Sequence, residues 1–484
     1  MSNITHGKYE AVIGLEVHAQ LNTRSKLFSG DANAFGSRQN IHVSPITLGH
    51  PGTLPRMNKL TIEQAIKVGL VFESEISKSN YFARKNYFYP DLPKGYQISQ
   101  HTTPICIGGK VNILTADGER DIKLTRIHLE EDAGKSIHDQ HDSFTLLDYN
   151  RAGVPLIEIV SEPDMHSAEE AAAYLTEIRK LVRWIGVCDG NMEEGSLRCD
   201  ANISVRLKGA TKLGTRVEVK NLNSIKHLKH AVELEIDRLI ELTEKGIGII
   251  QETRSYDAEK GITFAIRTKE DAEDYRYFPE PDLAPFEFDD SFVEGLQKTI
   301  PELPSKRIIR YKDEYGLSNY DAIQLTEERE LSDLYDKIAE VTTHKKILAN
   351  FLIGPVRSYI SAYDLNWTAV EVTVENWSSL LDLVADGKVG FSVAAQKLLP
   401  VILNDKSSDP LALARNLDLI QDANQDEIKD WVLQVLHNMP DKVDEYKKGK
   451  KGLLGLFIGE VKKISKGKAD PQKTTTLFNE YLNN

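Results

Sequence analysis

The sequence predicts an α+β protein, in which a domain built on an antiparallel or mixed sheet is followed by parts made only of helices. Two observations carry this prediction. Strand-like alternation of apolar and polar residues recurs through the first 222 residues, without a regular alternation of strands and helices. From about residue 294 onward, apolar residues recur with the helical period, interrupted by Pro and Gly.

Length and composition limit the class of protein. A chain of 484 residues is too long for one ordinary core, so we expect about two to four domains. No apolar run approaches the roughly 18 residues of a membrane span, and the N-terminus lacks a signal-peptide pattern. The 3 cysteines, none close to another, form neither a disulfide framework nor a zinc knuckle. We therefore expect a cytoplasmic protein without membrane contact.

The first domain is expected over residues 1–293. Six segments alternate like strands or are continuously apolar: 9–22, 110–116, 121–131, 154–160, 196–207 and 215–222. Three segments have the helical period: 60–72 with Thr61 as its N-cap, 166–186 between Ser167 and Gly186, and about 224–245. This mixture predicts a sheet with a few long helices packed on it.

Two all-α domains are expected after it, over 294–407 and 408–484, because the polar, turn-rich segment 403–410 is typical of a linker. The net charge is −13, yet residues 447–468 hold 8 lysines against 1 glutamate. This local excess of positive charge indicates contact with RNA phosphates, with a merely solvated lysine face as the alternative.

Carboxylates and one imidazole recur on the predicted strands. Glu16 and His18 lie two residues apart, so they share one face of a strand. Asp200 and Glu218 lie on two later strands, each among alternating polar residues. Glu158 stands alone among apolar neighbours, and an isolated carboxylate is costly to bury unless a cation lies beside it.

Hard oxygen ligands with one imidazole favour Mg²⁺ or Mn²⁺ over zinc, and Mg²⁺ commonly shares its coordination with substrate phosphates. The alternative is that each acid pairs with a nearby Arg or Lys on a solvated sheet face, and that His18 is a structural, hydrogen-bonded residue. A P-loop is excluded, because the first glycine of that motif would fall on Leu129 in the segment that ends in DAGKS.

Long motifs stand in order along the chain: IGLEVHAQL, LGHPGTLP, RKNYFYPDLPKGYQISQ, HLEEDAGKS, GVPLIEIVSEPD, MEEGSLRCDANIS, VEVKNLNS, DYRYFPEPDL and, near the C-terminus, YKKGKKGLLGLFIGEVKKISKGKADPQ. In these motifs the chain resembles, over essentially its whole length, the B subunits of the bacterial tRNA-dependent amidotransferases. The resemblance implies a cradle-shaped kinase domain, a helical domain and a small helical tail that contacts tRNA.

The same resemblance implies a reaction. ATP phosphorylates the side-chain carboxylate of misacylated Glu-tRNA(Gln) or Asp-tRNA(Asn). Ammonia, released from glutamine by an A subunit in a heterotrimer with a C subunit, then displaces the phosphate. Either misacylated tRNA, or both, stays open as the substrate. A non-catalytic tRNA-binding or assembly subunit with structural acids is the second hypothesis. A stand-alone metal-dependent hydrolase is the third, and it leaves the basic tail unexplained.

By matching motifs, the resemblance implies six metal ligands: Glu16, His18, Glu131, Glu158, Asp200 and Glu218. The first four are also the implied catalytic residues. Strand parity favours Glu130 over Glu131, because Glu130 shares a face with Arg126 and His128, so this choice stays open; a bulge would reconcile the two. Candidates for binding the nucleotide or the tRNA end, with charge balance as the alternative, are Arg126, Lys135, Arg198 and Lys220. Candidates for tRNA contact in the tail are Lys447, Lys448, Lys450, Lys451, Lys462 and Lys463.

The chain departs from the family in one loop. Many members carry a cysteine zinc knuckle there, whereas the matching positions in this chain are Ser29, Asp31, Ser44 and Thr47. None of these is a thiolate, so we expect no zinc. Packing and backbone hydrogen bonds are expected to hold the loop instead.

Overall fold

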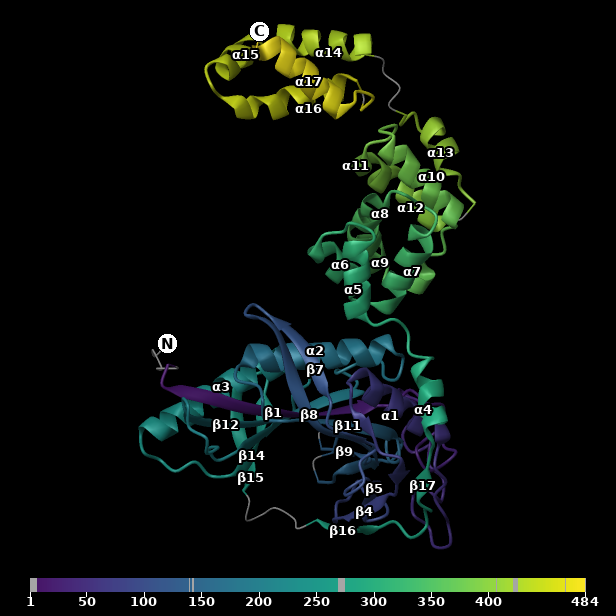
Figure 1. Ribbon diagram of the computed structural model, residues 1–484, viewed down its shortest axis with the longest axis vertical. Coiled ribbons are helices and arrows are strands. Elements are labelled where there is room, and N and C mark those ends of the chain that lie inside the picture. Colours follow the sequence, from purple (N-terminus) through teal and green to yellow (C-terminus); the bar gives the residue numbers. More distant parts are fainter. Residues whose placement is uncertain are drawn as a thin grey trace. The chain divides into compact units, whose positions relative to one another are not determined.

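A computed structural model describes residues 7–138, 140–141, 143–268, 275–405, 407–420, 425–465 and 467–483. The chain divides into two compact units, Met1–Leu303 and Pro304–Asn484. The first unit holds a large sheet with helices and the second consists of helices (Figure 1). The predicted α+β class is thereby confirmed. Among the described residues, none of the helices has both the length and the apolar character needed to cross a membrane.

The main sheet of the first unit is mixed. From one edge to the other its strands are β15 (Ile262–Thr268), β14 (Glu252–Asp257), β13 (Val217–Lys220), β12 (Leu197–Leu207), β1 (Tyr9–Gln20), β11 (Pro155–Ser161), β8 (Gly118–Glu131), β5 (Tyr96–Ser99), β4 (Ala83–Asn86) and β16 (Arg276–Pro279). The β13–β14 pair is parallel and the other pairs along this order are antiparallel. All six predicted strands are present, while β14, β15 and β16 were not predicted.

Shorter strands complete this unit. On the β8 side, the main sheet is extended by β2 (Glu75–Ile76), β6 (Cys106–Ile107) and β7 (Lys110–Thr115). Two small sheets are formed by β9 (Lys135–Ile137) with β10 (Leu146–Asp148), and by β3 (Ser79–Asn80) with β17 (Phe286–Glu287).

Two long helices cover one face of the main sheet (Figure 1). They are α2 (Ala168–Trp184) and α3 (Ile225–Glu244), which pack on each other and on β1, β7, β12 and β15. Ser167 caps α2 as predicted, and Gly186 follows its end with a φ of 73°. Buried apolar residues of the strands, such as Leu15, Val17 and Ile157, face these helices and form the core. The opposite sheet face is therefore available for polar side chains.

The remaining helices of the first unit are α1 (Lys59–Val71) and α4 (Asp290–Gln297). The predicted N-cap of α1 was wrong. Asn58 is the N-cap, since its side chain accepts a hydrogen bond from the N–H of Leu60. Thr61 lies inside the helix, where its hydroxyl donates to the carbonyl of Asn58. Asn and Thr are both common N-caps, so the sequence alone did not separate them.

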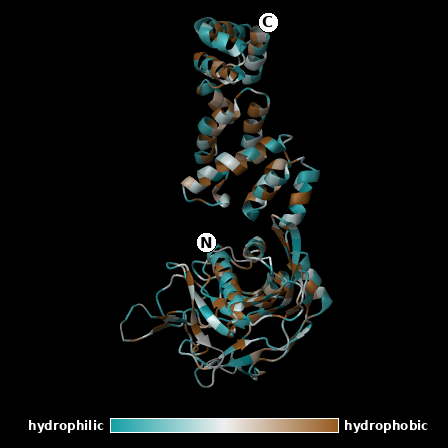
Figure 2. Ribbon diagram, turned by 90° about the vertical axis from the view of Figure 1, so that its left-hand side faces the viewer, coloured by the Kyte–Doolittle hydropathy of each residue, from teal (hydrophilic) through white to brown (hydrophobic). Residues whose placement is uncertain are grey.

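The second unit is helical throughout its described residues. Its α-helices are α5 (Pro304–Asp313), α6 (Asn319–Leu325), α7 (Arg329–Ala339), α8 (Lys345–Phe351), α9 (Arg357–Ala362), α10 (Val374–Ala385), α11 (Phe391–Val393), α12 (Leu399–Asn404), α13 (Pro410–Asn416), α14 (Gln425–Asn438), α15 (Pro440–Lys447), α16 (Leu454–Ile464) and α17 (Pro471–Asn483). Figure 2 shows hydrophobic and hydrophilic residues side by side on these helices, as expected for amphipathic helices.

Two separate hydrophobic clusters lie in this unit. One gathers around Trp377 and includes Ala414 of α13. The other gathers around Phe457 and Phe478 and begins at Ile428. The residues of α13 thus pack with the preceding helices, although this segment follows the expected linker at 403–410.

Candidate active site

The uncovered face of the main sheet carries the predicted acids. In the register of the strands, His18 of β1 lies opposite Glu158 of β11, and Glu16 lies opposite Asp200 of β12. On the next strand, Glu218 of β13 lies opposite Asn202. Directly paired residues point to the same face of a sheet. The alternation read from the sequence therefore brings these side chains together, at the floor of a cleft with a volume of about 760 Å³.

A first cluster forms where β1, β11 and β8 meet. The Nε2 atom of His18 lies 3.3 Å from Glu158 Oε2 and 3.7 Å from Glu130 Oε1. A second imidazole, His128, lies 3.5 Å from Glu158 and 3.7 Å from Glu130. One donor atom each from His18, Glu130 and Glu158 fall within 4.8 Å of one another, which is the spacing that a shared cation requires.

A second cluster lies beside it, towards β13, and consists of Glu16, Asp200 and Glu218. The Nζ atom of Lys220 lies 2.5 Å from Asp200 Oδ2 and 3.0 Å from Glu218 Oε1. Asn202 donates a hydrogen bond of 2.9 Å to Glu16. This cluster thus already contains one positive charge.

The ionisation of these groups follows from their burial and their neighbours. Burial, together with the charge of Glu158, raises the pKa of Glu16. Burial alone would lower the pKa of His18, but its hydrogen bond to Glu158 and the surrounding carboxylates outweigh burial and raise that pKa to about 9. Burial would likewise raise the pKa of Glu158, but His128 and His18 lower it overall. The positive form of His18 is therefore favoured beside Glu158 and Glu130.

The structure does not bring Glu131 into the cleft with the other predicted ligands. The register between β8 and β11 runs unbroken from Glu131–Pro155 to Arg126–Val160, so no bulge turns Glu131 towards the cleft. Glu131 instead forms an ion pair with Lys94 and accepts a 2.8 Å hydrogen bond from the N–H of Ile98. Glu130 occupies the place beside His18, as strand parity favoured.

The four predicted nucleotide-binding cations do not all reach the cleft. Arg126, Arg198 and Lys220 line it, whereas Lys135 lies exposed on β9, outside the cleft lining. Arg198 is paired at 2.8 Å with Asp132. The Nε atom of Arg126 is buried and has no hydrogen-bond partner within the described residues.

Two cations that line the cleft, Lys85 and Arg216, were not among the four predicted ones. Lys85 of β4 lines the cleft and forms no ion pair with any described residue. Its Nζ atom lies 4.8 Å from the ring centroid of Tyr275 and 5.9 Å from that of Tyr87. The charges of Glu130 and Glu158 outweigh burial and raise its pKa, so the ammonium form is stable there. The motif RKNYF contains this lysine, but nothing in its spacing distinguishes it from a solvated lysine.

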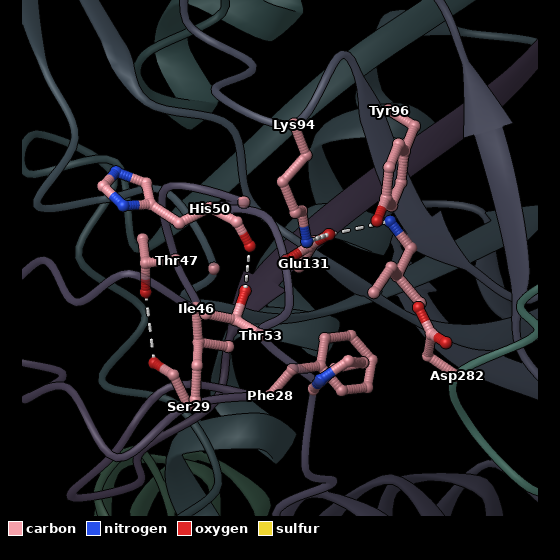
Figure 3. A pocket seen from close by; sticks show the side chains of 14 residues that line it. Phe28, Ser29, Ile46, Thr47, His50, Thr53, Lys94, Tyr96, Glu131 and Asp282 are labelled. Carbon is pink, nitrogen blue, oxygen red and sulfur yellow. Dashed lines mark hydrogen bonds and ion pairs between the residues drawn. The ribbon is translucent and has the colours of Figure 1, made fainter.

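A separate, small cavity of about 70 Å³ is lined in part by the loop that departs from the family (Figure 3). Ser29, Ser44 and Thr47 converge on the carboxylate of Asp31, with the hydroxyls of Ser29 and Ser44 at 3.1 and 2.9 Å and Thr47 also donating. Figure 3 also shows Ser29 joined to Thr47. The expected packing and backbone bonds are therefore supplemented by a side-chain network centred on Asp31. The absence of zinc stays a prediction.

All six tail lysines are exposed. Two of them have acidic partners, Lys450 with Glu445 and Lys463 with Glu460. The Nζ atom of Lys451 lies 4.2 Å from the ring centroid of Tyr446. Their contact with tRNA stays a prediction.

The chain is similar to known proteins along almost its whole length. A family model described as the GatB/GatE catalytic domain matches residues 11–294, and one described as the GatB domain matches residues 333–482. The chain is 47% identical to the B subunit of the aspartyl/glutamyl-tRNA(Asn/Gln) amidotransferase of Alkalilimnicola ehrlichii, over 98% of this chain and 99% of the relative. It is 45% identical to that of Thioalkalivibrio sulfidiphilus over 98% and 100%, and 44% identical to that of Wolbachia pipientis over 99% and 100%. The motifs, the fold and these relatives lead to one conclusion: the chain belongs to the family of aspartyl/glutamyl-tRNA(Asn/Gln) amidotransferase B subunits.

Proposed function

We propose that this chain is the ATP-using subunit of a tRNA-dependent amidotransferase, a ligase that converts Glu-tRNA(Gln), Asp-tRNA(Asn) or both into the amide form. The observation that carries the proposal is the pair of acid clusters that share β1 in one cleft, beside Lys85, which has no ion-pair partner among the described residues. The names of the relatives support the substrate class. A heterotrimer with a glutaminase A subunit and a C subunit, located in the cytoplasm where tRNAs are charged, is part of the proposal.

The donor sets fit a hard divalent cation. Five carboxylates and one imidazole are typical of Mg²⁺ or Mn²⁺. His18, Glu130 and Glu158 would hold one ion, and Glu16, Asp200 and Glu218 a second. The buried Nδ1 atom of His128, which has no hydrogen-bond partner among the described residues, indicates that this cleft is not a self-sufficient ion-pair network. Bound there, Mg²⁺ would neutralise charge on phosphate oxygens.

The residues of the chain have distinct roles in this chemistry. Lys85 and Arg126 would donate hydrogen bonds to the oxygens of the transferred phosphoryl group. An oxygen of the substrate carboxylate attacks the γ-phosphorus, the bond to ADP breaks, and an acyl phosphate forms. Ammonia then attacks the acyl carbon and phosphate leaves. Since positioning and charge neutralisation supply most of the catalysis of phosphoryl transfer, no protein nucleophile is required.

A non-catalytic tRNA-binding or assembly subunit is the second candidate function. The ion pairs of Lys220 with Asp200 and Glu218 favour it, because they satisfy these acids without a metal. Reconstituted A, B and C subunits should be given labelled ATP with each of the two misacylated tRNAs. ADP formation that requires misacylated tRNA supports the catalytic proposal and identifies the substrate. Equal ATP turnover with and without misacylated tRNA would support the second candidate.

A further inference from the structure

The cleft has two chemically different sides. On the β12–β13 side, most of the lining side chains are charged or amide groups, such as Arg198, Asn202 and Lys220, and no aromatic ring is among the described residues there. On the β4–β16 side, four rings line the cleft: Tyr87, His101, Tyr275 and Tyr277. The first acid cluster lies between the two sides, since its strands β1, β11 and β8 separate β12 from β5 and β4.

The aromatic side is not part of the core. Tyr277 stacks on His101 with ring centroids 4.0 Å apart and an angle of 13° between the planes. Tyr87 and Tyr275 meet edge to face at 5.3 Å, with Tyr275 still 41% exposed. The hydroxyls of these three tyrosines form no hydrogen bond with described residues. Such rings, already ordered beside the cation Lys85, are typical of surfaces on which unpaired nucleobases stack.

We propose that the aromatic side binds the terminal adenosine of the aminoacyl-tRNA, with its base stacked on the Tyr277–His101 pair, while ATP lies on the β12–β13 side. This inference rests on the proposed function. In phosphoryl transfer, the attacking and leaving oxygens lie roughly in line, on opposite sides of the phosphorus. With the phosphoryl group at the central cluster, the carboxylate and the ADP therefore approach from opposite sides of the cleft.

The charges of the cleft decide which substrate takes which side. A triphosphate needs several positive partners. The β12–β13 side offers the cations Lys220, Arg198 and Arg216, and its acid cluster, which already offsets Lys220, would carry a divalent cation as well. The aromatic side offers one cation among its described residues, Lys85, and four rings. Four rings and one cation suit the last nucleotide of a tRNA, which has one base and one phosphate, better than they suit a triphosphate.

The test uses the complete complex and a tRNA whose terminal adenine is replaced by 2-aminopurine, a base whose fluorescence falls when it stacks. Binding to the unchanged complex should quench the fluorescence without ATP. Tyr277→Ala should abolish most of the quenching and raise the KM for misacylated tRNA by roughly five- to a hundredfold, the range for one lost base–aromatic stack. The KM for ATP should change less than about twofold, since its site would lie on the other side. Tyr277→Phe, which keeps the ring, should retain both values.

Phe278→Ala is the matched control. Phe278 neighbours Tyr277 on β16 and lies opposite Arg84, whose guanidinium carbon is 5.9 Å from its ring centroid, so its side chain points away from the cleft. The Phe278→Ala variant should therefore quench 2-aminopurine fluorescence as strongly as the unchanged complex. Tyr275 precedes β16, so Tyr275→Ala allows the same quenching measurement if Tyr277→Ala fails to fold. Retained quenching in both alanine variants, or a KM increase for ATP alone, would overturn the proposal. Absence of tRNA-dependent ADP formation in the unchanged complex would instead refute the proposed function, because the quenching needs no turnover.

Discussion

Replacing Glu130 and Glu131 separately with Gln makes the same chemical change at adjacent positions on opposite faces of β8. Glu130 contributes a donor atom to the first acid cluster. Loss of one of three protein ligands should cost several kcal/mol. About 3 kcal/mol corresponds to a little more than a hundredfold weaker binding. We expect Glu130→Gln to weaken Mn²⁺ binding by about that factor and to reduce tRNA-dependent ADP formation similarly.

Glu131→Gln should have a different effect. The side chains of Lys94 and Glu131 are only 12% and 6% exposed, and breaking a buried ion pair costs about 3–5 kcal/mol. The variant should therefore unfold at a lower temperature, whereas its affinity for Mn²⁺ should change less than about threefold. Electron paramagnetic resonance titrations of free Mn²⁺ and thermal unfolding of both variants measure these quantities. An equal loss of Mn²⁺ affinity in the two variants would refute the assignment by strand parity.

Four further predictions concern other parts of the chain. Glu16→Gln or His18→Ala should reduce tRNA-dependent ADP formation by about a hundredfold or more. Glutamine hydrolysis by the partner subunit and tRNA binding should persist. Normal ADP formation in these variants would remove the acid clusters from the mechanism. The neighbouring carboxylates raise the pKa of His18 to about 9, and the imidazole must be neutral to bind a metal. Mg²⁺ binding should therefore release a proton, and the affinity for Mg²⁺ should rise from pH 7 to pH 9 by at most about tenfold per pH unit. Calorimetry in buffers of different protonation enthalpy measures the proton release. Deleting residues 421–484 should weaken tRNA binding and flatten its salt dependence; unchanged affinity would assign the tail lysines to a solvated surface. Asp31→Ala should leave the hydroxyls of Ser29, Ser44 and Thr47 without their acceptor and destabilise the loop around Asp31 by about 1–3 kcal/mol. Backbone hydrogen exchange in that loop should become faster. An unchanged exchange rate would show that packing alone holds the loop.

Strand periodicity predicted which face of the sheet carries the site better than it predicted which residues belong to the site. Because side chains alternate strictly along a strand, the sequence alone was enough to place Glu16, His18 and Asp200 correctly. Glu130 and Glu131 were ambiguous because two adjacent acids always offer one to each face. The motif resemblance pointed to Glu131, whereas the register with β11 places Glu130 in the cluster.

The aromatic side of the cleft was beyond sequence reasoning. β4 and β16 have four residues each, too few for a periodic pattern to stand out. Their pairing joins Lys85 to Tyr277, which are far apart along the chain, and only the folded sheet reveals that they are neighbours. Lys135 illustrates the converse, since a basic residue next to a conspicuous motif lies on a different, smaller sheet.

The position of β16 at the edge of the sheet has a consequence for biosynthesis. The last strand in sequence that contributes to the acid clusters is β13, which ends at Lys220. In contrast, β16 cannot leave the ribosome until residue 279 has been made. Because a chain emerges from its N-terminus, the floor of the cleft can assemble before its aromatic wall. Closing the sheet requires contact between segments distant in sequence, which is a slow step in folding. If the two proposals hold, a nascent chain would thus complete its proposed metal ligands before the proposed site for the tRNA end.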